Sequence, residues 1–336
     1  MNSAQSSLEP SRERLANPFT CYVLATRPAF LSITLAGCLL GFATAAAGGA
    51  AFDWERALVT LLLALLAHAG INVLNDYCDH LNGTDARNTQ RIYPFTGGSR
   101  FIQNGVLSPR QVLVFAVALF AATIAGGLWL LSVAGAGLFW IGLAGLAIGW
   151  AYSAPPLQLN SRGVGELCVA TGFLLVVAGA DYAQRGAWVP LPWLAGAPYA
   201  LLVANVLYIN QFPDRAADRA SGKLHWVARL QPQTAAWGYG LMLMLAALAL
   251  LGGMLLGAYD STRALARSGS EAFRALPWIA ACAFVAWIPA VRAWRQLRRF
   301  AAVPGQLTPA IKLTLLAAHV LPLLLATILL LSGDFL

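Results

Sequence analysis

Residues 55–85, ERALVTLLLALLAHAGINVLNDYCDHLNGTD, combine a long apolar run with an acidic end. A run of about 20 apolar residues is long enough for a helix that crosses the hydrocarbon core of a bilayer. Near its end, four polar residues stand at positions i, i+3, i+4 and i+7 and therefore share one helical face: Asn72, Asn75, Asp76 and Asp79. Carboxylates in membrane segments are rare and functional. The stretch predicts a membrane helix with a polar site at one end.

The composition of the whole chain also indicates a membrane protein. Of its 336 residues, 59% are hydrophobic and 11% are charged, whereas a soluble domain carries about 25% charged residues. So few charges cannot cover a water-facing surface, and so many apolar residues exclude intrinsic disorder. The five Cys and four His are scattered, which argues against a disulfide framework and a zinc or haem site. We expect an all-α polytopic membrane protein.

Hydrophobic runs between charged or Gly- and Pro-containing breaks predict nine transmembrane helices. Their expected bounds are 28–48, 55–76, 110–131, 134–152, 163–181, 192–212, 234–257, 274–294 and 310–333. Residues 1–27 are polar and show no signal peptide. The expected organisation is therefore a cytoplasmic N-terminal segment, 1–27, followed by one transmembrane domain, 28–336.

Basic residues orient the predicted bundle. Most of the 22 Lys and Arg lie in the N-terminal segment and in the loops after the second, fourth, sixth and eighth spans. The positive-inside rule places these parts in the cytoplasm. Anionic lipid at that surface explains the net charge of +8 without a nucleic-acid partner.

A second acidic face follows the sixth predicted span, in residues 209–223, INQFPDRAADRASGK. Asn210, Asp214 and Asp218 stand at positions i, i+4 and i+8 of a helix, and Pro213 is expected to kink it. Carboxylate and amide oxygens suit magnesium, which commonly binds one or two carboxylates together with substrate phosphates. Basic residues follow both acidic faces and could hold the remaining phosphate oxygens. They are Arg87, Arg91, Arg100, Arg215, Arg219, Lys223 and Arg229.

The two faces together predict a magnesium-bridged diphosphate at the membrane surface. For one site they must converge within about 12 Å, given coordination distances of about 2 Å. One alternative is a pair of solvated helix ends with weak surface ion pairs. Another is an ion-coupled transporter, which would place carboxylates near the bilayer midplane, whereas the interior of these spans carries almost no charge.

Further candidate residues lie on the same cytoplasmic side. Gly97 and Gly98 permit a turn whose amides could approach phosphate oxygens, with Ser99 and Arg100 adjacent. Tyr152 ends the fourth predicted span, where its ring could stabilise a carbocation. The other candidates are Arg162 after that span and Tyr208 as a cavity-lining residue. We expect Glu166 to pair with Arg162 and Asp181 only to end a span on the opposite side.

At these residues the sequence resembles the UbiA superfamily of intramembrane aromatic prenyltransferases. The matching motifs are Asn75-Asp76-x-x-Asp79, Asn210-x-x-x-Asp214-x-x-x-Asp218 and Tyr152-Ser153-x-x-Pro156. The resemblance covers nearly the whole chain, and NDYCDHLNGTDARN with the later PFTGGS is similar to the menaquinone branch. This branch prenylates 1,4-dihydroxy-2-naphthoate. Departures at Pro213, where Arg is common, and at Leu224-His225-Trp226 concern the acceptor rather than the metal.

The resemblance implies a bundle around a central cavity open to lipid and a set of roles for these residues. Mg²⁺ would be held by Asn75, Asp76, Asp79, Asp85, Asn210, Asp214 and Asp218. A polyprenyl diphosphate and a small aromatic acceptor would contact Arg87, Arg91, Gly98, Ser99, Arg100, Arg162, Tyr208 and Lys223. The catalytic residues would be Asp76, Asp79, Asp214, Asp218 and Tyr152, in a bacterial inner membrane.

The resemblance leaves the acceptor open. Alternatives to the naphthoate are 4-hydroxybenzoate, homogentisate and haem B. A UbiA-like terpene cyclase, in which the allylic cation attacks its own chain, is a further alternative.

Overall fold

The protein is described here by a computed structural model that covers residues 9–15, 17–266 and 276–333. Over those residues it consists of helices joined by turns and loops, which confirms the all-α prediction. The α-helices are α2 (Pro18–Ala25), α3 (Pro28–Ala47), α4 (Trp54–Leu81), α5 (Thr84–Arg87), α6 (Pro109–Ala134), α7 (Leu138–Ser153), α8 (Gly165–Arg185), α9 (Leu191–Ala220), α10 (Trp226–Arg229), α11 (Pro232–Ala266), α12 (Trp287–Phe300) and α13 (Thr308–Gly333). Three short 3₁₀ helices are η1 (Leu159–Ser161), η2 (Trp278–Ala286) and η3 (Pro304–Gln306).

Within the described part of the chain, seven helices are long and apolar enough to cross a membrane: α3, α4, α6, α8, α9, α11 and α13. Each coincides with a predicted span, and the chain is an integral membrane protein. The count of nine is not confirmed. Helix α7 has 16 residues, about 24 Å, which is shorter than a hydrocarbon core of about 30 Å. The span expected at 274–294 is formed by η2 and the first half of α12, and its first two residues lie outside the described part.

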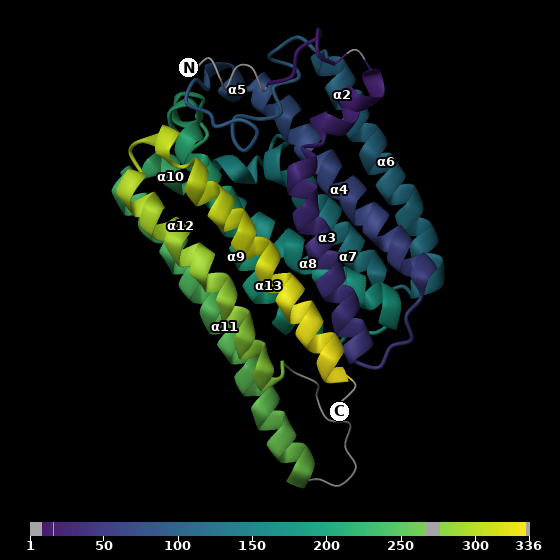
Figure 1. Ribbon diagram of the computed structural model, residues 1–336. Helices are drawn as coiled ribbons and strands as arrows, with labels where there is room; N and C mark the ends of the chain where they lie inside the picture. Colours follow the sequence, from purple (N-terminus) through teal and green to yellow (C-terminus); the bar gives the residue numbers. More distant parts are fainter. Residues whose placement is uncertain (1–8, 16, 267–275, 334–336) are drawn as a thin grey trace.

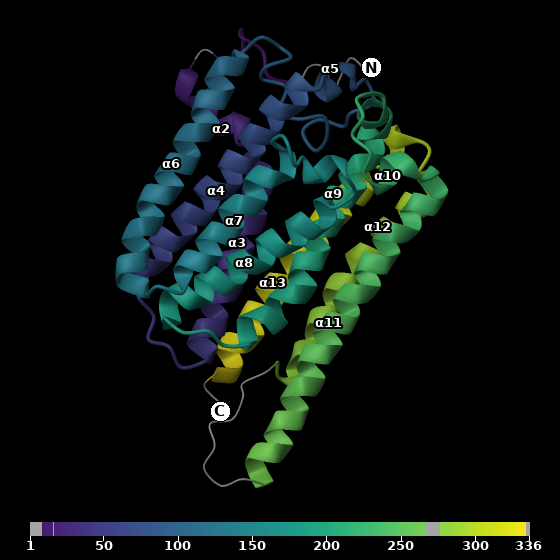
Figure 2. The same cartoon turned by 180° about the vertical axis from the view of Figure 1, so that it is seen from behind.

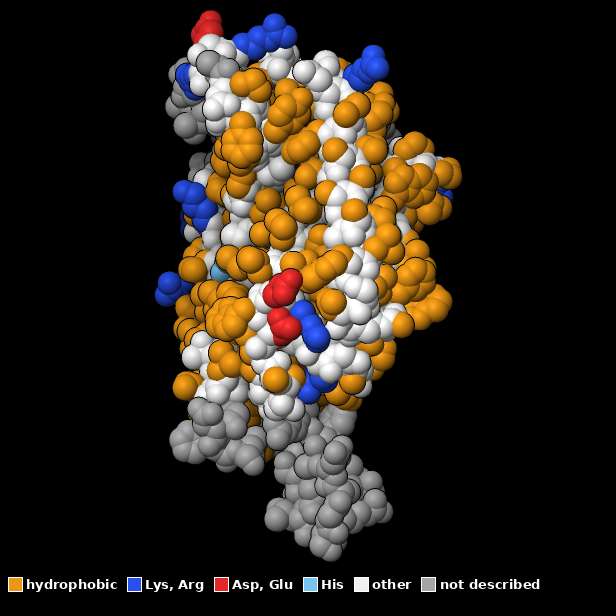
Figure 3. Space-filling model, turned by 90° about the vertical axis from the view of Figure 1, so that its right-hand side faces the viewer, with side chains coloured by type: hydrophobic (Ala, Val, Ile, Leu, Met, Phe, Trp, Pro, Cys, Tyr) orange, Lys and Arg blue, Asp and Glu red, His pale blue; other side chains and the backbone are white. Residues whose placement is uncertain are grey.

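The long helices run side by side, with α2, α5 and α10 at one end of the bundle and the end of α13 at the other (Figures 1 and 2). Helix α9 is central and packs against α3, α8, α11 and α13. Figure 3 shows a broad hydrophobic band over one side of the bundle, with few charged side chains across it. Such a surface suits lipid, because a hydrocarbon phase solvates apolar side chains and excludes charges.

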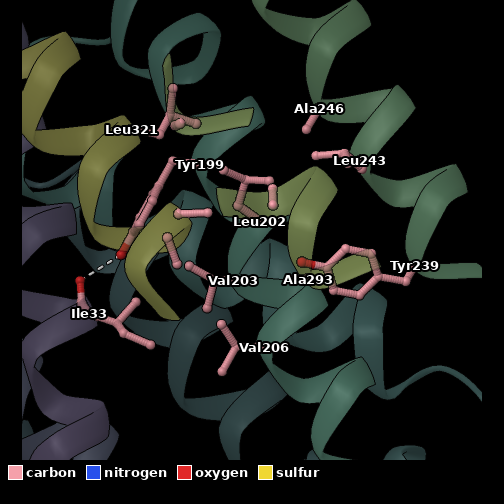
Figure 4. Close-up of a cluster of buried hydrophobic side chains, with 14 of the residues drawn as sticks. Ile33, Tyr199, Leu202, Val203, Val206, Tyr239, Leu243, Ala246, Ala293 and Leu321 are labelled. Carbon is pink, nitrogen blue, oxygen red and sulfur yellow. Dashed lines mark hydrogen bonds between the residues drawn. The ribbon is translucent and has the colours of Figure 1, made fainter. Parts of the chain in front are cut away.

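The core between α3, α9 and α11 fixes the position of α9 (Figure 4). Leu202, Val203 and Val206 of α9 are buried at helical spacing. The Tyr199 hydroxyl donates a hydrogen bond of 2.6 Å to the carbonyl of Ile33 in α3. Burying a hydroxyl costs free energy unless it has such a partner. The packing therefore sets where the acidic end of α9 lies.

Both acid-bearing helices are longer than the sequence predicted. Helix α4 continues to Leu81 and α9 to Ala220, so the acids lie on the last helical turns. Pro213 lies inside α9 without ending it. A helical proline removes one backbone donor, and here tertiary packing outweighs that loss.

Candidate active site

The acidic ends of α4 and α9 meet at the side chain of Lys223. Its Nζ atom lies 2.9 Å from Asp79 Oδ2 and 3.8 Å from Asp218 Oδ1. Asp218 also contacts His225 Nε2 at 2.8 Å. The two faces thus converge on one nitrogen atom, well within the expected separation. Burial alone would lower the pKa of Lys223, but Asp79 and Asp218 outweigh it and hold that pKa well above its ordinary value.

The loop between α5 and α6 packs directly on the carboxylates. The backbone N–H of Gly97 donates to Asp214 Oδ2 at 3.2 Å, and that of Ser99 donates to Asp76 Oδ2 at 3.1 Å. These amides were expected to face phosphate, but they hold the two aspartates in place instead. Gly98 has φ +73°, and a Cβ there would collide with Asp85 Oδ2 and crowd Asp76. Only glycine fits this turn.

A cavity of about 290 Å³ opens beside these carboxylates. Its polar lining includes Asn75, Asp79, Asp85, Gly98, Tyr152, Asn210, Asp214, Asp218 and Lys223. The rest is largely apolar and extends along α4 as far as Ala64 and along α8 to Val176. At 1.5 Å per helical residue, Asp79 and Ala64 lie about 22 Å apart. The cavity therefore offers a polar mouth and a long apolar arm at membrane depth.

Several buried oxygen atoms at or next to the mouth have no hydrogen-bond partner. Two of them, Asp218 Oδ1 and Asn210 Oδ1, belong to residues that line the cavity. A third is Asp76 Oδ1, which lies next to Gly98, and Asp76 does not itself line the cavity. Burial, together with the charges of Asp79 and Asp76, raises the pKa of Asp85 well above its ordinary value. Unpartnered oxygens and crowded carboxylates are what a bound cation would relieve.

The donor set fits magnesium in chemistry. In the described residues, no three His, Cys, Asp or Glu side chains surround one point. Magnesium does not require such a cage, because it commonly uses one or two carboxylates, waters and substrate phosphates. Carboxylate and amide oxygens of α4 and α9 lie on the two sides of the cavity mouth, so this site can supply the few protein oxygens that magnesium needs.

Four predicted phosphate-binding arginines do not line the cavity. Arg91 and Arg100 are buried but directed to Glu9, at 2.7 Å and 3.9 Å. Arg87 is exposed and donates to the carbonyl of Asn82. Arg162 is likewise exposed and donates to the carbonyl of Pro156 at 2.8 Å.

Three other expectations need correction. Tyr208 does not line the cavity, because its hydroxyl donates to the carbonyl of Ala235 in α11 at 2.7 Å. Glu166 accepts a hydrogen bond of 2.7 Å from Gln211 and does not pair with Arg162. Asp181 does not end a span, since α8 continues to Arg185.

Sequence reasoning missed several residues at the mouth. Arg27 lines the cavity directly before α3, and a basic residue at the start of a span could have indicated it. His225 lies seven residues after Asp218, beyond the regular spacing that identified the acids. Asn88 donates its side-chain amide to Asp214, and nothing in its sequence context indicated that contact.

The fold and the site together are those of an integral membrane protein whose cavity combines a polar mouth with an apolar arm. The sequence model described as the UbiA prenyltransferase family matches residues 34–306. The chain belongs to this family and is a membrane prenyltransferase.

Named relatives are consistent with the family. The chain is 30% identical over 215 residues to the 1,4-dihydroxy-2-naphthoate octaprenyltransferase of Mycobacterium leprae, covering 63% of this chain and 70% of the relative. The Escherichia coli enzyme of the same name is 30% identical, with 61% and 66% covered. A UbiA prenyltransferase domain-containing protein 1 of Danio rerio is 27% identical, with 68% and 67% covered.

Solved structures share the fold. A UbiA homolog from Aeropyrum pernix aligns with a TM-score of 0.59 and 17% identity over 91% of this chain and 99% of that one. A homolog from Archaeoglobus fulgidus bound to DMAPP and Mg²⁺ gives a TM-score of 0.52 and 17% identity, covering 84% and 98%.

Proposed function

We propose that this enzyme transfers a polyprenyl group from a polyprenyl diphosphate to 1,4-dihydroxy-2-naphthoate, with magnesium. One observation carries the proposal: two carboxylate-bearing helix ends meet at Lys223 above an apolar arm. The arrangement suits a diphosphate head at the mouth and a hydrocarbon tail below. The naphthoate is supported by the names of the bacterial relatives.

The residues at the mouth have distinct roles in binding the donor. Asp76, Asp79, Asp214 and Asp218 would hold magnesium, with Asn75, Asn210 and Asp85 as further oxygen donors. When bound, magnesium supplies positive charge to the diphosphate. Lys223 lies between the two acidic faces, where its ammonium would donate to a phosphate oxygen of the donor.

The reaction breaks the bond between the allylic carbon and the diphosphate oxygen, and the diphosphate leaves with the bonding electrons. Fixed positive charge contributes most where negative charge develops, and Lys223, which lines the cavity, is placed to supply it. Tyr152 lines the cavity, where its ring would present a π face to the developing carbocation. Apolar walls exclude water that would quench the cation.

An electron-rich ring carbon of the acceptor then forms the new carbon–carbon bond. With 1,4-dihydroxy-2-naphthoate, the ring carboxylate leaves as carbon dioxide and its electrons restore the aromatic ring. Arg27, which lines the cavity from the start of α3, would supply positive charge to this carboxylated acceptor.

We place the mouth at the cytoplasmic surface of a bacterial inner membrane. Support comes from the basic residues of the segment before α3 and of the loops at the end where α5 and α10 lie. The positive-inside rule assigns that end to the cytoplasm. Both proposed substrates carry negative charge and would approach from that side.

Purified protein in lipid discs tests the proposal when it is given magnesium, a polyprenyl diphosphate and one acceptor at a time. We expect a prenylated naphthalene product and carbon dioxide only with the naphthoate, and none after chelation with EDTA. Turnover with 4-hydroxybenzoate, homogentisate or haem B instead would identify that compound as the acceptor and refute the naphthoate. Diphosphate release without an acceptor would favour a cyclase. No turnover of any donor would refute the transferase.

A further inference from the structure

The N-terminal segment before α2 reaches the loop that packs on the site. Glu9 in this segment is 7% exposed. Its Oε1 accepts a hydrogen bond from Arg91 Nε at 2.8 Å, and its Oε2 one from Asn104 Nδ2 at 3.2 Å. Asn104 also donates to the carbonyl of Pro10 at 2.9 Å. Arg12 donates to the carbonyl of Gly105 at 2.6 Å. The segment is thus attached at several points to residues 91–105.

From Glu9, one chain of contacts leads to the acidic face on α9. Arg91 Nη1 donates to the carbonyl of Asn88 at 2.5 Å. The Asn88 side-chain amide in turn donates to Asp214. The aliphatic part of Arg91 also packs beneath Gly97, whose N–H donates to the same aspartate. Glu9 therefore reaches Asp214 through two side chains.

A second chain leads to the acidic residues that follow α4. Arg100, 3.9 Å from Glu9, donates through Nη1 to the carbonyl of Asp85. The carboxylate of Asp85 adjoins Gly98. Through its two arginines, Glu9 is connected to one aspartate from each side of the mouth.

The charges explain why this connection needs a carboxylate. Arg91 and Arg100 are both buried. Burial and the neighbouring Arg91 lower the pKa of Arg100. Two guanidinium groups share this space, and Glu9 supplies the negative charge between them. Removing one partner of a buried ion pair is costly, because the remaining charge must stay unpaired or move to water. Without Glu9 the two guanidinium groups would lose this negative charge and keep their hydrogen bonds to the backbone carbonyls of Asn88 and Asp85.

We propose that Glu9 is a positioning residue that fixes the loop at residues 88–100, and thereby the affinity for the diphosphate head of the donor. The inference rests on the proposed function and deepens it. Glu9 does not line the cavity, so it acts through Arg91 and Arg100. Its loss should weaken donor binding more than it slows the chemical step.

The test compares Glu9→Gln with Glu13→Gln, which changes an exposed acid in the same segment. For Glu9→Gln we expect the KM for the prenyl diphosphate to rise about tenfold, because a charged hydrogen bond is lost. The kcat and the KM for the acceptor should stay within about twofold. Glu9→Asp, which keeps the charge, should recover most of the donor affinity. Glu13→Gln should match the wild type.

Hydrogen exchange followed by mass spectrometry gives a readout that does not need turnover. The peptide covering residues 88–107 should exchange faster in Glu9→Gln than in Glu13→Gln. Wild-type exchange and donor KM in Glu9→Gln would overturn the inference, as would an equal rise in both KM values. If Glu9→Gln does not fold, the comparison passes to Glu9→Asp. Wild-type exchange of this peptide in Glu9→Asp supports the charge requirement. A Glu9→Asp variant that also fails to fold refutes a role confined to the loop. Absence of turnover in the wild type would refute the proposed function and leave the exchange test intact.

Discussion

Buried aspartates occur at both ends of the bundle, and their surroundings differ. In the last turns of α8, Asp181 is 1% exposed and both of its carboxylate oxygens accept hydrogen bonds. It accepts from Arg185 Nε at 2.9 Å and from the Thr44 hydroxyl at 2.9 Å. Arg185 also donates to the carbonyl of Thr44, near the end of α3. At the other end, Asp76 and Asp218 are similarly buried, but each has one oxygen that accepts no hydrogen bond.

The difference separates a structural ion pair from a binding site. Around Asp181, every donor and acceptor serves to join α8 to the end of α3. An unsatisfied buried oxygen costs stability, and proteins retain such groups where a ligand satisfies them. Two aspartates of similar burial in one bundle can therefore have opposite roles. Substitutions should separate these roles.

The largest effect is expected at the mouth. Asp214→Asn should lower turnover about a hundredfold or more, because it removes a metal ligand and the charge that attracts it. Stability should fall less than activity, because the amide keeps the size of the carboxylate and one of the two acceptors that bind Asn88 and Gly97. The measurement is product formation with magnesium, beside thermal unfolding in detergent. Near-normal activity of Asp214→Asn would refute the proposal that the acidic faces of α4 and α9 together form the metal site.

The opposite pattern is expected for Asp181→Asn. Loss of this buried charge leaves Arg185 unpaired and should lower the free energy of unfolding by about 3 kcal/mol. Turnover per folded molecule should be unchanged. Unfolding in a denaturing detergent series measures the change, with the exposed Glu55→Gln as control. An Asp181→Asn variant with normal stability and no activity would contradict the assignment of Asp181 to a structural ion pair rather than to a binding site.

A smaller effect is expected at Tyr152, where the mouth meets the apolar arm. Tyr152→Leu should lower kcat about tenfold through loss of its π face, whereas Tyr152→Phe should retain most activity. Single-turnover rates at saturating donor make the comparison. Equal losses in both variants would assign the role to the hydroxyl.

The smallest effect is expected at Arg162, the exposed arginine bonded to Pro156. Arg162→Gln should change the donor KM by less than about twofold, since an exposed charge is screened by solvent. Initial rates over a range of donor concentrations give the KM. A large rise would return this residue to the phosphate-binding set.

The sequence predicted what regular spacing determines. Membrane helices follow from apolar runs, and Asp76 with Asp79 or Asp214 with Asp218 share a face because helical periodicity requires it. The convergence of the two faces was also predictable, since a diphosphate site needs donors from both.

Contacts between distant segments were not predictable. Arg91 and Arg100 were assigned to phosphate because they follow an acidic face, but Glu9, some 80 residues earlier, is their partner. Tyr208 lies close to Asp214 in sequence, yet helix rotation points it to α11. Spacing along one helix gives a face, whereas only packing decides which neighbour that face meets.

The apolar arm that extends to Ala64 determines which concentration of the prenyl donor controls the rate of the enzyme. Each methylene group of a prenyl chain held in lipid contributes about 0.8 kcal/mol to its partitioning. A long-chain donor therefore resides almost wholly in the membrane and meets the arm by lateral diffusion. Its saturation should follow the mole fraction of donor in the bilayer and fall when inert lipid is added at a constant bulk amount. Saturation by a water-borne acceptor would not change when inert lipid is added. The same active site would therefore respond to the mole fraction of the donor in the bilayer and to the aqueous concentration of the acceptor.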